Sequence, residues 1–151
     1  MKTESGRSLI EIIGVLALTA IMTAGAVKLY SSIRTNQAHT IAAAELREIA
    51  KDTKLLFDMR DDYAGVSVDY LLKAGAIKKD NAPLGNAWAI EPFADQKSFA
   101  IKLFDLGHSD CEFFAVSVPQ WASDVIVNNH SVEDNPQCFS GNTNNVFFIV
   151  E

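Results

Sequence analysis

The sequence contains no proline before Pro83, and all four of its prolines lie between Pro83 and Pro136. Proline in a helix interior removes a hydrogen bond and clashes with the preceding turn, so its absence permits one long uninterrupted helix. Apolar residues recur at intervals compatible with one helical face, namely Ala38, Ala42, Leu46, Ile49 and Leu56. We therefore expect a single helix over about residues 9–60. Its opposite face carries a mixed-charge set expected to meet solvent or neighbouring subunits: Glu45, Glu48, Lys51, Asp52 and Lys54.

Basic clusters and catalytic motifs are also missing. The net charge of -6 argues against general binding to nucleic acid, whose phosphates require clustered Lys and Arg. The three histidines, His39, His108 and His130, are scattered without metal-ligand spacing, and we expect them at the surface. The aspartates within residues 58–62 lack the ligand spacing of a calcium loop. With no nucleophile elbow or phosphate-binding glycine loop either, we expect no enzyme, no cofactor and no metal.

What the sequence does have is a 19-residue apolar stretch, residues 9–27, whose only charge is Glu11. That length suffices for a helix to cross a membrane, and Lys2 and Arg7 before it favour a cytoplasmic N-terminus. A carboxylate within a membrane span costs several kcal/mol when unpaired, so Glu11 indicates a function. A plain signal anchor that tolerates Glu11 is the alternative.

This N-terminus resembles that of the type IV pilin family, whose prepilins carry a short hydrophilic leader ending in Gly and an apolar helix with Glu fifth. "MKTESG" ends at Gly6, and Glu11 is the fifth residue after it, within "SLIEIIGVLAL". Arg7 stands where the family usually has Phe, Met or Leu. The resemblance implies that a prepilin peptidase cuts between Gly6 and Arg7, that Arg7 is N-methylated, and that Glu11 acts in filament assembly.

The rest of the chain resembles the heads of type IVb pilins, in "YLLKAGAI", "NAWAIEP", "IVNNHSV" and "QCFSGNTNNVFFIV". The resemblance implies a disulfide between Cys111 and Cys138 and a helix over residues 109–120. An exported chain permits a disulfide, although two buried free thiols are the alternative.

Local signals predict the elements of this head. Ser67 is a candidate helix N-cap, with Gly75 near the end of that helix. Two short apolar-rich runs within residues 88–104 predict a hairpin, in which Pro92 favours an edge strand or a bend. Asn128-Asn129 predicts a tight turn, and the terminal "NNVFFIVE" fits a buried last strand. The phenylalanine pairs 113/114 and 147/148 are expected in the core.

The predicted fold is α+β, with a long N-terminal helix packed on a small antiparallel-sheet head in a ladle shape. The expected divisions are a leader (1–6), a transmembrane and assembly helix (7–29) and a head (30–151) that includes the amphipathic half of the helix. The resemblance implies a structural pilus subunit that serves attachment, conjugation or secretion. Its implied partners are other copies of itself, the prepilin peptidase, an inner-membrane platform protein and an assembly ATPase.

Before assembly, the chain would sit in the bacterial inner membrane with its head in the periplasm, and afterwards in the extracellular filament. A minor pilin or a secretion pseudopilin is the near alternative. A monomeric, membrane-anchored periplasmic binding domain is the alternative from another class. A Glu11 placed after a Gly-terminated leader favours a pilin, because a monomeric anchor has no need of it.

Overall fold

A computed structural model describes residues 9–151, so the predicted cleavage site at Gly6 and Arg7 lies outside the described residues. The helix α1 spans Leu9–Phe57, an uninterrupted 49 residues, and ends three residues before the predicted end at Arg60. The chain divides into two units at Ala38 and His39, and each unit is described by itself below.

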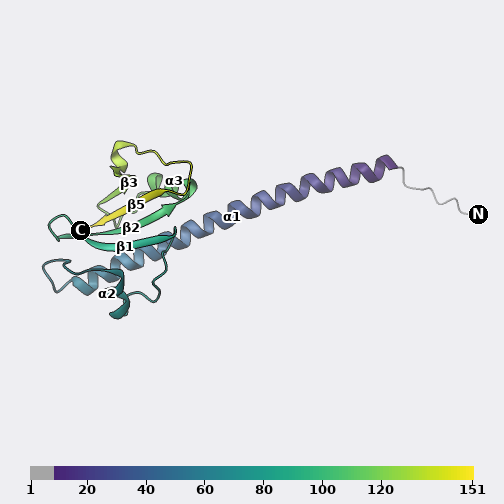
Figure 1. Ribbon diagram of the computed structural model, residues 1–151. Helices are drawn as coiled ribbons and strands as arrows, with labels where there is room; N and C mark the ends of the chain where they lie inside the picture. Colours follow the sequence, from purple (N-terminus) through teal and green to yellow (C-terminus); the bar gives the residue numbers. More distant parts are fainter. Residues whose placement is uncertain (1–8) are drawn as a thin grey trace, which may run out of the picture. The chain divides into compact units, whose positions relative to one another are not determined.

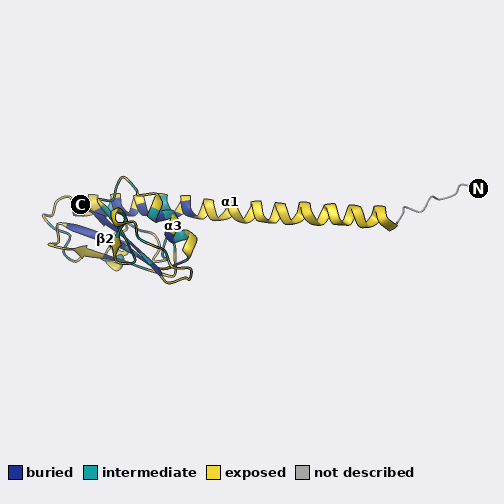
Figure 2. Cartoon of the chain, turned by 90° about the horizontal axis from the view of Figure 1, so that it is seen from above, coloured by how far each residue is buried: buried dark blue, intermediate teal, exposed yellow. Residues whose placement is uncertain are grey.

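The first unit consists, in its described part, of α1 from Leu9 to Ala38. Every residue in this stretch is exposed, as the uniform colour of this part of α1 in Figure 2 shows. Over residues 9–27 this exposed surface is apolar except for Glu11 and two threonines, and a helix with an apolar surface nearly all round requires an apolar environment or partner helices.

The second unit is built on a five-stranded antiparallel sheet with the order β1-β2-β5-β3-β4 (Figure 1). The strands are β1 (Ala87–Phe93), β2 (Ser98–Leu106), β3 (Asp124–Val127), β4 (His130–Ser131) and β5 (Asn144–Val150). The predicted hairpin is formed by β1 and β2, and Pro92 lies on the edge strand β1, where its missing N–H leaves no gap in the sheet. The last strand, β5, pairs on both sides with β2 and β3 and supplies the buried centre of the sheet.

The two predicted local motifs of the head are present. Ser67 caps the short helix α2 (Val68–Lys73) by accepting a hydrogen bond from the Tyr70 N–H at 3.1 Å. Asn128 and Asn129 form the turn between β3 and β4 with φ of 49° and 71°, a left-handed conformation that Asn tolerates better than most residues.

The C-terminal half of α1 packs its buried face against the sheet and joins the hydrophobic core. The prediction for this face was correct for Ala42, Leu46 and Ile49 but wrong for Ala38 and Leu56, which are exposed. These two residues lie at one margin of the buried face, because that face is centred nearer Leu46 and Thr53. The positions buried in their place are His39, Ala50, Thr53 and Phe57.

The helix α3 spans His108–Val116, so the prediction of a helix over residues 109–120 was wrong at its C-terminal end. Pro119 disfavours helical geometry at the residue before it, and the helix closes with the Ser117 N–H donating to the Phe113 carbonyl at 2.9 Å. A short 3-10 turn, η1 (Val132–Asp134), follows β4. Of the four phenylalanines expected in the core, Phe114 and Phe148 are fully buried, and the others are half-buried.

Candidate functional site

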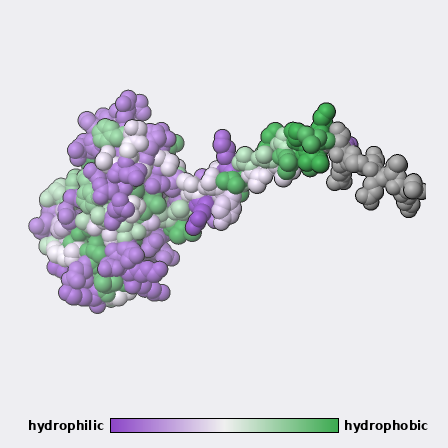
Figure 3. Space-filling view, turned by 45° about the vertical axis from the view of Figure 1, so that its right-hand side comes forward, coloured by the Kyte–Doolittle hydropathy of each residue, from purple (hydrophilic) through white to green (hydrophobic). Residues whose placement is uncertain are grey.

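The first candidate region is the apolar start of α1, with Glu11 as its third residue. By length and composition this helix could cross a membrane: its most apolar window has a mean hydropathy of 2.1, and none of that window is buried by the described chain. Figure 3 shows apolar surface gathered on this part of the helix, whereas much of the head's visible surface is hydrophilic. Glu11 is therefore a single carboxylate on an otherwise apolar, uncovered helix surface.

The hydroxyl side chains of this segment are satisfied within the helix itself. Thr19 donates to the Val15 carbonyl at 2.7 Å, and Thr23 donates in the same way to the carbonyl of Thr19. Such back-bonding leaves these hydroxyls without need of water, which suits a helix surrounded by lipid or by other apolar helices. Glu11 differs, because it takes part in none of the hydrogen bonds or ion pairs found among residues 9–151.

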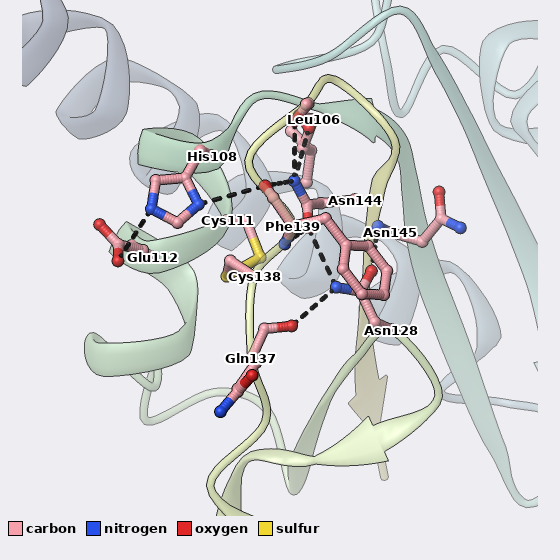
Figure 4. Close-up of a disulfide and its surroundings, with 11 residues drawn as sticks. Leu106, His108, Cys111, Glu112, Asn128, Gln137, Cys138, Phe139, Asn144 and Asn145 are labelled. Carbon is pink, nitrogen blue, oxygen red and sulfur yellow. Dashed lines mark hydrogen bonds and ion pairs between the residues drawn. A yellow bond between two sulfur atoms is a disulfide. The ribbon is translucent and has the colours of Figure 1, made fainter.

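The second candidate region is the disulfide between Cys111 on α3 and Cys138 in the segment before β5 (Figure 4). The structure thus contains the bridge that the resemblance implies, with a Cα–Cα distance of 5.9 Å, and Cys111 is fully buried. His108 lies beside it and contacts the Phe139 carbonyl through Nδ1 at 3.1 Å. The bridge therefore attaches to α3 a segment, residues 135–143, that contains no helix or strand.

Asn144, at the start of β5, fastens the same segment from its other end. Its buried side chain donates to the carbonyls of Leu106, Phe139 and Gly141 at 3.0–3.1 Å. Its Oδ1 accepts from the Phe139 N–H at 2.7 Å and from Asn128 Nδ2 at 3.0 Å. In the sequence this asparagine stands out only as part of the family-like ending "QCFSGNTNNVFFIV". Its polar type within an apolar terminal strand was the available signal, since a buried amide needs several partners.

His39 on α1 is buried, so the prediction of a surface histidine was wrong at this position, whereas His108 and His130 are exposed. Its Nε2 lies 2.7 Å from Asp110 Oδ1, and its ring stacks on Phe113 with a centroid distance of 4.5 Å. Both partners belong to α3, so His39 joins α3 to the second unit's part of α1. No local pattern indicated this contact, because it joins positions 71 residues apart.

The aspartates at the end of α1 do not form a metal site with other side chains. Within residues 9–151 no group of three or more His, Cys, Asp or Glu side chains is placed to hold a metal ion. Asp62 instead accepts a hydrogen bond from the Ala64 N–H at 3.1 Å, as a turn residue does. Nearby, burial and then the negative charge of Asp58 raise the pKa of Tyr63 above its ordinary value of about 10.

Comparison with known proteins finds similarity among solved structures. No family model matches the sequence, and no curated protein matches it either. Among solved structures, the chain is similar to the crystal structure of TcpA, a type IV pilin from Vibrio cholerae El Tor biotype, with a TM-score of 0.61 and 16% sequence identity. The match covers 76% of this chain and 99% of that chain. A long apolar N-terminal helix, a C-terminal helical half packed on a small antiparallel sheet and this match together show that the chain has the type IV pilin fold.

Proposed function

We propose that this chain is the structural subunit of a type IV pilus, similar to the type IVb class. In this proposal a prepilin peptidase cuts between Gly6 and Arg7 and methylates the Arg7 amino group. A platform protein and an assembly ATPase then move the subunit from the inner membrane, with its head in the periplasm, into an extracellular filament of identical copies.

The observation that carries the proposal is the exposed apolar segment of α1 with Glu11 near its start, on a chain with the pilin fold. The described chain covers none of this surface, so it needs lipid before assembly and apolar partner helices afterwards. The disulfide and the Asn144 contacts support the proposal further, because an extracellular subunit must keep its head folded without chaperones.

Glu11 would set the axial register of the subunits. After cleavage, the free amino group of Arg7 and the Glu11 carboxylate of an adjoining copy carry opposite charges among packed apolar helices. An unpaired charge there carries a penalty of several kcal/mol, which pairing relieves only at the right axial stagger. Apolar packing would then supply adhesion, and the charge pair would select the stagger.

Processing is tested by the intact mass of the protein from its native membrane. We expect loss of "MKTESG", which leaves 145 of the 151 residues, together with one added methyl group. An uncut chain, or a cut beyond Val27 that removes the apolar helix, would contradict the pilin proposal.

Assembly is tested by comparing sheared surface filaments with membrane fractions on immunoblots. We expect Glu11→Ala to leave export, membrane insertion and head folding intact while strongly reducing the subunit in filaments. Arg7→Phe, which restores a usual family residue, should be tolerated. Glu133→Ala, which removes an exposed carboxylate from the head, is the matched control.

The outcomes also separate the alternatives. Filaments that persist when this chain is deleted but incorporate it at low ratio would indicate a minor pilin or pseudopilin. A processed or unprocessed chain found only as a membrane-bound monomer would indicate an anchored binding domain. Normal filament yield from Glu11→Ala would show that this carboxylate does not select the register.

A further inference from the structure

The part of α1 within the second unit exposes two groups of charge, one of each sign. The buried face, centred near Leu46 and Thr53, lies between the two groups on one side of the helix, whereas on the exposed side they adjoin at Glu48 and Lys51. We call the first group the basic flank, which consists of Arg47, Lys51 and Lys54, and the second the acidic flank, which consists of Glu45, Glu48 and Asp52. All six side chains are exposed or half-buried. The charges that look mixed along the sequence therefore occupy two sectors of the helix surface, one on each side of the buried face.

The segregation places like charges next to each other within the helix. Arg47 and Lys51 are four residues apart, as are Glu48 and Asp52, and like charges at this spacing destabilise a helix. None of these four side chains takes part in an ion pair among residues 9–151. Among the six charges, only Glu48 and Lys51 are of opposite sign at a spacing that stabilises a helix, so most of these charges gain nothing from one another.

The surfaces beside the two flanks also differ. Arg47 lines a hollow in the head together with four apolar residues and one amide side chain, which are Ala43, Ala44, Pro119, Gln120 and Trp121. Exposed apolar side chains accompany the acidic flank. On α1, Ile41 is 65% exposed and Leu55, which lies between the two flanks, is 63% exposed; Met59, in the turn after the helix, is 99% exposed. One flank thus offers a positive charge beside a hollow, and the other offers negative charges beside apolar projections.

We propose that the basic flank of one copy of this chain docks against the acidic flank of the next copy. Opposite charges would meet across the contact, and the exposed apolar side chains beside the acidic flank would face the hollow beside Arg47. This inference rests on the proposed filament function and identifies which head surfaces meet. The two flanks are unlike, so the contact is heterologous, and such contacts generate open helical assemblies when the rotation does not close a ring.

The test reverses each flank separately and then both together in the full-length chain, in cells that carry its assembly machinery. The basic-flank variant is Arg47→Glu with Lys51→Glu, and the acidic-flank variant is Glu48→Lys with Asp52→Lys. The fourfold variant combines them and retains the net charge of -6. The matched control is Lys78→Glu with Lys79→Glu, which reverses two exposed lysines outside both flanks. Non-reducing gels and thermal melts of each variant confirm that the head is folded.

We expect each single-flank variant to lower the yield of sheared filaments by at least about tenfold, because like charges would face each other across the contact. The fourfold variant should recover most of the yield, since exchanging both signs restores opposite charges, and the control should assemble normally. Two results would overturn the docking proposal but not the proposed function: full assembly of the single-flank variants, or a fourfold variant that is folded but does not recover the filament yield. Absence of filaments from the unmodified chain would instead overturn the proposed function.

Discussion

Asn144 offers the sharpest test of how the head is held together. Its fully buried side chain makes five hydrogen-bond contacts: the two N–H groups of the amide are shared among three carbonyls, and Oδ1 accepts two. These contacts link β5 to the end of β2 and to the segment that carries Cys138 (Figure 4). Asn144→Ala removes all five. It also leaves the Leu106 carbonyl without this donor at a position where the asparagine had excluded water.

The magnitude follows from the number of contacts. A protein hydrogen bond contributes about 0.5–1.5 kcal/mol net, so five such contacts predict a loss of about 2.5–7.5 kcal/mol in the free energy of unfolding. A domain of this size has a total stability of about 5–15 kcal/mol, so the variant head would be marginal at growth temperature. The disulfide restricts the unfolded state of the wild type and of Asn144→Ala equally, so it does not reduce the difference in their free energies of unfolding.

The measurement is guanidinium unfolding of the full-length chain in detergent, followed by tryptophan fluorescence. Trp121 is a suitable reporter, because its ring lies 5.3 Å from that of Phe148 in the core. The matched control is Asn145→Ala. The half-buried Asn145 side chain makes none of the hydrogen bonds found for Asn144, so this substitution should lower the free energy of unfolding by less than about 1 kcal/mol. A similarly small loss for Asn144→Ala would refute the reasoning.

Three further predictions concern the head. Replacing Cys111 and Cys138 together by Ser should lower the free energy of unfolding by about 3.5 kcal/mol, from the 27-residue separation in the chain-entropy model, and two reactive thiols in denatured, unreduced wild-type protein would exclude the bridge. Tyr63 has a raised pKa, so the neutral phenol is favoured in the fold; its contribution to stability is complete below about pH 10 and is lost as pH rises through the folded-state pKa. Tyr63→Phe should therefore show a smaller loss of stability between pH 9 and 12 than wild type in parallel melts, and identical slopes would contradict this. His39→Phe keeps a ring for stacking but removes the contact with Asp110, so the denaturation midpoint should report a loss of about 1–3 kcal/mol, and an unchanged midpoint would show that the contact contributes nothing.

Local sequence signals predicted the elements whose geometry depends on near neighbours. Ser67 was correctly predicted as a helix cap, and Asn128-Asn129 as a tight turn, because both need only residues within a few positions. The long helix was predicted from the absence of proline and from the apolar run, and its end was wrong by only three residues. The candidate site at Glu11 could also be recognised from the sequence alone, because a lone carboxylate within an apolar run is unusual.

Contacts between distant residues could not be predicted in this way. The buried position of His39 depends on Asp110 and Phe113, which lie on α3 more than 70 residues later. The five hydrogen-bond contacts of Asn144 reach four residues in three separate stretches of chain, so its role in bracing the disulfide-bonded segment depends on contacts that its immediate neighbours do not specify.

The sequence by itself thus determined the continuous helix, its apolar uncovered start with Glu11, the caps and the turns, because backbone preference and hydrophobic period act over a few residues. Only the tertiary structure decided which face of α1 is buried, and therefore that the charges following His39 separate into a basic and an acidic flank. It also decided that β5 enters the centre of the sheet, between β2 and β3. The physical reason is that burial and strand order are set by the fit of whole surfaces, which involves residues from every part of the head at once.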